Sequence, residues 1–87
     1  MPFDLSHGPE FDPHARQRMR QRNIHEDQIR AALVSFHTSY LAPRVGNSPI
    51  RSMIYVATID GRDLKVYVAD GSQPPLVMTA ARTDEET

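Results

Sequence analysis

The stretch IRSMIYVATIDGRDLKVYVA, residues 50–69, decides the fold. It contains two runs of β-branched and aromatic residues joined by the turn composition DGR, which is typical of a β-hairpin. We expect a three-residue loop, Asp60–Arg62, because that register gathers the apolar residues of both strands on one face. A two-residue loop would oppose them to Lys65 and Tyr67. The three-residue register places four polar or aromatic side chains together on the other face: Arg51, Tyr55, Lys65 and Tyr67.

Two further strand-like segments flank this hairpin. TSYLAPRV, residues 38–45, precedes it and PLVMTAAR, residues 75–82, follows it. The separating segments GNSP and DGSQPP have turn compositions. The four segments therefore predict a four-stranded antiparallel meander.

Two helices are predicted before the strands. Asp12 followed by Pro13 is typical of an N-cap with proline at the first helical position, so the first helix should run from about Pro13 to Arg22. A second helix from about Glu26 to Phe36 is indicated by Gln28 at the third position of a capping box. Its apolar residues share helical spacing and form one face: Ile29, Ala32, Leu33 and Phe36.

The element order ααββββ predicts an α+β fold, with an N-terminal helical hairpin packed on one face of a four-stranded, mainly antiparallel sheet. With 87 residues, the chain has the length of one domain. We expect an irregular lead-in at residues 1–10, the α+β domain at 11–83 and an acidic tail at 84–87.

Composition excludes several classes of function. The chain has no cysteine, which rules out disulfides and thiolate zinc sites and fits a reducing cytoplasm. No apolar stretch is long enough to cross a membrane, and a formal net charge of −1 gives no support for binding DNA on its own. The histidines lack metal-ligand spacing and no glycine-rich loop precedes a helix, so neither a metal nor another cofactor is expected.

The first predicted helix carries one histidine and four arginines within nine residues. Helical geometry directs Arg16 and Arg20 to solvent, whereas His14, Arg18 and Arg22 share the inward side with the apolar stripe. A guanidinium on that side needs a partner.

Two alternatives remain open for His14, Arg18 and Arg22. In the first, His14 hydrogen-bonds the backbone near the start of the helix, and Arg18 and Arg22 pair with carboxylates such as Asp27, Asp60 or Asp63. Otherwise they form one wall of an anion site, suited to a phosphodiester because histidine moves protons near neutral pH and guanidinium holds phosphate oxygens. The sheet would add six side chains to that site: Arg51, Tyr55, Lys65, Tyr67, Thr79 and Arg82. Thr79 interrupts an apolar strand and Arg82 closes it, although each has an ordinary structural explanation when taken singly.

HARQRMRQRNIHEDQIRAAL, residues 14–33, resembles a widespread group of small bacterial proteins of unknown function that begin H-A-x-x-R-M-x-x-R-x-I. LVMTAAR, residues 76–82, matches the V-x-T-like final segment of that group. The layout is also similar to BrnT-type toxins, which belong to the RelE-like small ribonucleases. The resemblance covers about residues 11–86 and implies a RelE-like fold. It points to five matching positions: His14, Arg18, Arg22, Thr79 and Arg82.

Two features depart from that resemblance. RelE-like ribonucleases are usually basic, and a BrnT-type first helix is rich in lysine, whereas this chain has a net charge of −1 and carries arginine and glutamine there.

The resulting hypothesis is a toxin-type, metal-independent endoribonuclease or a descendant of one. His14 would act as general base or acid, with Arg18 and Arg82 stabilising the phosphorane. The remaining residues would bind or position RNA phosphate: Arg22, Arg51, Tyr55, Lys65, Tyr67 and Thr79. Its partners would be RNA or the ribosome, and a small antitoxin.

The first alternative is a non-catalytic module that binds an acidic or disordered partner through the same face, which the net charge of −1 favours. A second is nucleic-acid binding without catalysis, which a steep salt dependence would support.

Overall fold

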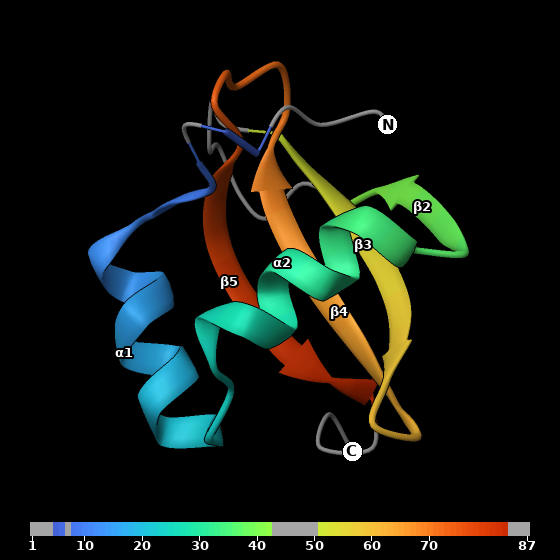
Figure 1. Ribbon diagram of the computed structural model, residues 1–87. Helices are drawn as coiled ribbons and strands as arrows, with labels where there is room; N and C mark the ends of the chain where they lie inside the picture. The colour runs from blue at the N-terminus through green and yellow to red at the C-terminus, as the bar shows by residue number, and fades with distance from the viewer. Residues whose placement is uncertain (1–4, 7, 43–50, 84–87) are drawn as a thin grey trace.

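The computed structural model describes residues 5–6, 8–42 and 51–83. The elements follow in the order β1 (Glu10–Phe11), α1 (Pro13–Arg22), α2 (Glu26–Ser35), β2 (Thr38–Leu41), β3 (Ser52–Ile59), β4 (Arg62–Ala69) and β5 (Leu76–Arg82) (Figure 1). The predicted α+β class is confirmed. The predicted tail at 84–87, residues 1–4 and 7 of the lead-in, and the end of the predicted strand 38–45 lie outside the described residues.

The sheet has five strands in the order β1-β5-β4-β3-β2. β2 to β5 form the expected antiparallel meander, and β1 pairs parallel with β5 through Glu10↔Leu76 and Phe11↔Val77. The expectation of four strands is therefore wrong. Two residues are too few to show a strand pattern in the sequence, and β1 is defined by its long-range pairing alone.

The central hairpin turns through two residues, so the predicted three-residue loop is wrong. Thr58 faces Asp63 and Ile59 faces Arg62, which leaves Asp60 and Gly61 in the turn. Their φ angles are 55° and 79°, and two positive values are what the type I′ turn, favoured by strand twist, requires. The error came from assuming that only one face of the sheet buries apolar residues.

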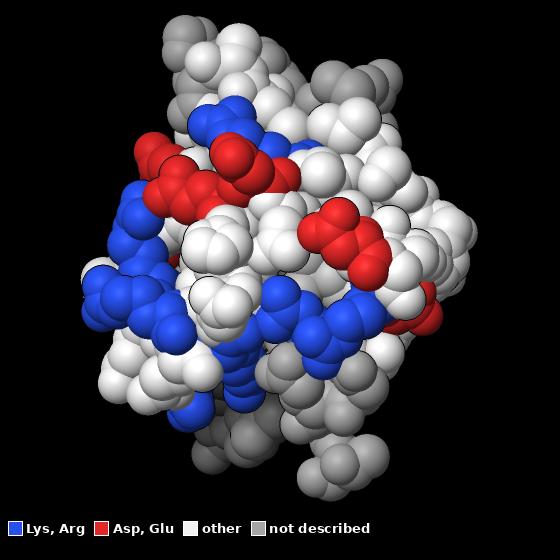
Figure 2. Space-filling view, turned by 60° about the horizontal axis from the view of Figure 1, so that its bottom comes forward, with Lys and Arg blue, Asp and Glu red and all other residues white. Residues whose placement is uncertain are grey.

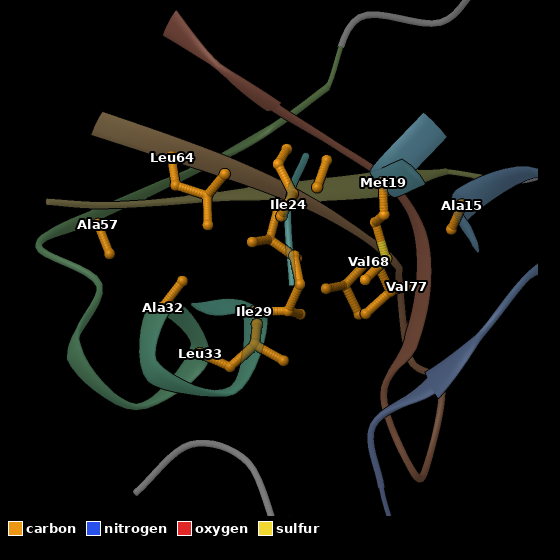
Figure 3. Packing of buried hydrophobic residues seen from close by; sticks show 12 residues of the cluster. Ala15, Met19, Ile24, Ile29, Ala32, Leu33, Ala57, Leu64, Val68 and Val77 are labelled. Atoms are coloured by element: carbon orange, nitrogen blue, oxygen red, sulfur yellow. The ribbon is translucent and has the colours of Figure 1, made fainter. Parts of the chain in front are cut away.

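The face beneath α2, here called the α2 face, holds the main core (Figure 3). Ile29, Ala32 and Leu33 of α2 are at most 1% exposed, and each large one contributes about 1.5–3 kcal/mol by burial. They cluster with residues from β3, β4 and β5, with the apolar stripe of α1 and with the residue that follows its C-cap: Ala57, Leu64, Val66, Val68, Val77, Ala80, Ala15, Met19 and Ile24.

The two helices pack on different parts of the sheet, so they do not form the predicted hairpin. α1 stands against β5 at the sheet margin, while α2 crosses β3 and β4 (Figure 1). Asn23 ends α1 in the left-handed region, with φ 55° and ψ 45°, and the Ile24 N–H donates to the Met19 carbonyl at 2.9 Å. This Schellman-type cap redirects the chain into α2.

The other side of the sheet, here called the opposite face, carries two cross-strand rows. Because paired residues share a face, one row contains Tyr40, Ile54, Tyr67 and Thr79, and the next contains Thr38, Val56, Lys65 and Ala81. Ile54, Val56 and Ala81 are buried there. Tyr55 instead lies on the α2 face, with its ring edge-on to Phe36 at 4.9 Å, so its predicted grouping with Lys65 and Tyr67 is wrong.

Candidate functional site

The start of α1 is fixed as the sequence predicts. The Asp12 carboxylate accepts a hydrogen bond from the His14 N–H at 2.9 Å, and Pro13 occupies the first turn. This cap satisfies a backbone donor that the helix leaves unpaired. It places His14 in the first helical turn with an exposed side chain.

His14, Arg18 and Arg22 follow at intervals of four residues and form a row that we call the α1 ridge. The Arg18 Nε donates to the His14 Nε2 at 3.4 Å, and its Nη1 donates to the Gln21 Oε1 at 3.4 Å. Both bonds are long and therefore weak. Arg18 thus lies over His14 without any neutralisation of its charge.

No described carboxylate pairs with Arg18 or Arg22, and the Asp12 carboxylate at the start of α1 bonds the backbone N–H of His14. Asp60 accepts from the Gln28 Nε2 at 3.3 Å, and Asp63 accepts from the Thr58 hydroxyl at 2.7 Å. Arg16 forms a salt bridge with Glu26 at 2.6 Å. Among these residues, the alternative in which Arg18 and Arg22 pair with Asp27, Asp60 or Asp63 is not realised.

The ridge faces away from α2. Arg16 reaches Glu26 at the start of α2 and lies over the Phe11 ring at 4.8 Å, so it marks the side of α1 that turns toward the α2 face. Arg18 lies about 160° around the helix from Arg16. The ridge therefore runs along a different side of α1, and Arg22 at its end reaches the Ala80 carbonyl of β5.

Two arginines fasten the end of α1 to β5, and we call this pair the arginine clasp. Arg22 Nη1 donates to the Ala80 carbonyl at 2.8 Å. In return, Arg82 donates from Nη1 to the Arg22 carbonyl at 2.7 Å and from Nη2 to the Asn23 carbonyl at 3.1 Å. These carbonyls lie at the negative end of the helix dipole, where a guanidinium is favoured.

The arginine clasp is not among the contacts expected from the sequence. Those expectations assign Arg22 to a carboxylate or to phosphate, and Arg82 to an ordinary strand end or to phosphate, although a basic residue in the last turn of a helix is also a known partner for terminal carbonyls. That signal was present in Arg22, whereas the pairing with Arg82 depends on how α1 packs. Figure 2 shows the basic side chains as a broken band across this end of the molecule, with acidic groups beside it.

The opposite face brings three predicted residues together. Thr79 pairs with Tyr67, and Lys65 pairs with Ala81 in the neighbouring row. A bulge lies between Tyr67 and Val68, whose partners are Thr79 and Val77, so Met78 is the extra residue. The bulge resets the alternation of β5. As a result Thr79 lies on the opposite face, next in sequence to the carbonyl of Ala80 that binds Arg22.

Two predicted residues lie elsewhere. Tyr55 is on the α2 face, where burial, and secondarily the negative charge of Asp70, raises the pKa of its phenol. Arg51 is exposed and precedes β3, with its carbonyl accepting from the Asp70 N–H at 2.8 Å. Neither joins the ridge or the row of Tyr67 and Thr79.

Within residues 5–6, 8–42 and 51–83, no three His, Asp or Glu side chains gather as a metal-binding group. No helix in those ranges is long and apolar enough to span a bilayer.

Comparison with known proteins gives one match. A family model described as "Domain of unknown function (DUF4258)" matches residues 11–82. The match begins in β1 and ends at Arg82, so it includes the α1 ridge and the arginine clasp. No curated protein and no solved structure matches the chain.

Proposed function

We propose that this chain, which belongs to the DUF4258 family, binds RNA through the α1 ridge and cleaves it as a toxin-type, metal-independent endoribonuclease, or descends from such an enzyme. One observation carries the proposal. His14, Arg18 and Arg22 form a row in which no described carboxylate balances the two guanidinium groups. A phosphodiester supplies the missing charge and matches the planar donors of Arg18, whereas Arg22 is held by the Ala80 carbonyl.

Phosphate binding requires little rearrangement of the ridge. The present bonds of Arg18, to His14 and Gln21, are both 3.4 Å long. Charge-assisted bonds to phosphate oxygens are typically about 2.8 Å and stronger. A bound phosphate therefore draws the Arg18 guanidinium away from the imidazole.

The same movement prepares His14 for proton transfer. With Arg18 on the phosphate, Nε2 of His14 is released and accepts the proton of the RNA 2′-hydroxyl. The 2′-oxygen then forms a bond to the adjacent phosphorus, and the bond from phosphorus to the 5′-oxygen breaks. The protonated imidazole or water returns a proton to the 5′-oxygen, giving a 2′,3′-cyclic phosphate and a 5′-hydroxyl. Arg18 stabilises the charge that builds on the phosphorane.

The remaining residues divide into two groups under this proposal. Lys65, Tyr67 and Thr79 lie on the opposite face and position the RNA backbone. Arg22 and Arg82 act as positioning residues, because their contacts hold α1 against β5. Arg82 therefore loses the role of phosphorane stabiliser, and Arg51 and Tyr55 are left out of the site.

The test is induced expression in a bacterial host, with growth and total-RNA integrity followed together. Wild type should arrest growth and cleave RNA, and His14→Ala and Arg18→Ala should lower cleavage by about 10²-fold or more. Arg20→Ala is the matched control, because Arg20 is exposed on the same helix but lies outside the ridge. Circular dichroism of the purified variants checks folding. Normal growth with intact RNA, or full activity in His14→Ala, would contradict the proposal.

A second candidate is a non-catalytic module that binds an acidic or disordered partner through the ridge. The net charge of −1 favours it, because unaided binding to RNA usually relies on a basic protein. In that case expression of wild type leaves RNA intact, and Arg18→Ala abolishes capture of an acidic protein partner while Arg20→Ala retains it.

A further inference from the structure

β2 forms one edge of the sheet, and it is exposed along its whole length. Tyr40 and Leu41 are 41% and 44% exposed, and they are two of the three exposed large hydrophobic residues in the described chain. Proteins commonly protect an edge strand with a charge, a proline or a bulge. The sequence of β2, Thr-Ser-Tyr-Leu, contains neither a charge nor a proline. β2 is thus competent to pair with another strand.

The backbone of β2 presents an alternating set of groups at this edge. The Ala42 N–H donates to the Ser52 carbonyl at 2.8 Å. Since bonded residues alternate in an antiparallel ladder, Tyr40 also directs its N–H and C=O toward β3, whereas Ser39 and Leu41 direct theirs outward. The His37 N–H is bonded to the Val56 carbonyl, so outward pairing begins at Ser39.

We propose that a second copy of the chain pairs antiparallel with β2 about a two-fold axis at Tyr40. Ser39 and Leu41 stand at equal distances from Tyr40. In this register Ser39 of each copy therefore faces Leu41 of the other, and each outward N–H meets an outward C=O. Tyr40 faces Tyr40 across the axis as a non-hydrogen-bonded pair, with both rings on the opposite face.

Three features favour a second copy as the occupant. The strand is self-complementary, as an isologous dimer requires. It carries no charge, so self-pairing brings no like charges together. The α1 ridge lies at the other margin of the sheet, beyond β5, and stays accessible in the dimer. Because the paired strands are short, the dimer is weak, with a dissociation constant in the micromolar range or above.

A cysteine pair tests the register directly, because the chain contains no natural cysteine. Tyr40→Cys places two thiols across the axis with Cα atoms about 4.5 Å apart, which suits a disulfide. Leu41→Cys is the matched control, because Leu41 faces Ser39 of the other copy and its own counterpart is more than about 7 Å away. Under a mild oxidant, Tyr40→Cys should form a covalent dimer at least about tenfold faster on a non-reducing gel. Equal rates, or a faster Leu41→Cys, would overturn the register.

Sedimentation of the unmodified protein tests the dimer itself. Tyr40→Lys sets two like charges face to face and should raise the dimer dissociation constant about tenfold or more. Val34→Lys is the control: Val34 is 51% exposed on α2, outside the paired strand, and its replacement should leave the dimer intact. A wild type that stays monomeric at several hundred micromolar, or a dimer that Tyr40→Lys does not weaken, would overturn the proposal. Neither assay uses RNA, so its outcome is independent of the proposed ribonuclease activity.

Discussion

The two edges of the sheet differ in how their backbone groups are covered. At one edge, β1 pairs with the start of β5, and beyond it Arg22 of α1 donates to the Ala80 carbonyl. At the other edge, all of β2 is exposed and no described helix lies across it. A sheet can therefore protect an edge with a helix and a guanidinium, and the same sheet can leave its other edge available. The α1 ridge belongs to the protected edge.

Removing the Arg82 guanidinium, at the protected edge, should cause the largest loss of stability. Arg82→Ala leaves the Arg22 and Asn23 carbonyls at the end of α1 without their donor. We expect the free energy of unfolding to fall by about 2–3 kcal/mol. Urea denaturation followed by circular dichroism measures it. Arg30→Ala, an exposed position on α2, serves as control and should change stability by less than about 0.5 kcal/mol. A loss of less than about 0.5 kcal/mol for Arg82→Ala would show that the arginine clasp does not stabilise the fold.

Removing the other half of the clasp should have a smaller effect. Arg22→Ala deletes one hydrogen bond, to the Ala80 carbonyl, and water can replace it because the edge is only half-buried. We expect a loss of about 1 kcal/mol. The double variant Arg22→Ala/Arg82→Ala should lose less than the sum of the two single losses, because both act on the same contact between α1 and β5. Strict additivity in denaturation experiments would show that the two arginines act separately.

A substitution in β2, at the exposed edge of the sheet, should hardly change the stability of the monomer. Leu41→Lys replaces a side chain that is already 44% exposed, so the free energy of unfolding should change by less than about 0.5 kcal/mol. Denaturation at low protein concentration isolates the monomer. A loss comparable to that of Arg82→Ala would show that β2 is as firmly integrated as β5.

The smallest effect concerns Tyr55, between the two edges. Burial, followed by the charge of Asp70, raises the pKa of its phenol above the ordinary 10.0. The folded state thus favours the neutral phenol, and this contribution to stability is complete below pH 10 and declines as pH rises through the folded pKa. In denaturation experiments at increasing pH, wild type should lose this increment above pH 10, and Tyr55→Phe should lack that loss. Identical pH profiles would contradict the assignment.

The local features of the fold were readable from the sequence. Asp12 and Pro13 set the start of α1, and the apolar spacing from Ile29 to Leu33 identified α2, because both signals depend on neighbours within one or two helical turns. The meander followed from strand composition and turn residues. The Asp60–Gly61 pair is itself typical of a two-residue turn. The three-residue loop follows only if apolar residues are buried on a single face of the sheet, and it shifts the expected pairing of β3 with β4 away from the observed one.

The features that failed depend on contacts between distant segments. β1 exists only through its pairing with Leu76 and Val77. Arg22 and Arg82 were recognised as unusual, yet their partners are backbone carbonyls about sixty residues away in sequence, and no side-chain pattern identifies those. For the candidate site, helical spacing correctly grouped His14, Arg18 and Arg22 on one side of α1, whereas the position of Tyr55 required the true register.

The parallel pairing of β1 with β5 also determines when the site is assembled during folding. β3 and β4 close across a two-residue turn, whereas Glu10 and Leu76 are more than sixty positions apart, and closing so long a loop is slower. The hairpin should therefore form early, and the margin that carries α1 should form last. If the protein acts on translating ribosomes, a nascent chain cannot complete its ridge until β5 has been synthesised. The contacts that hold α1 against the sheet therefore depend on β5, the last element to be synthesised among those described.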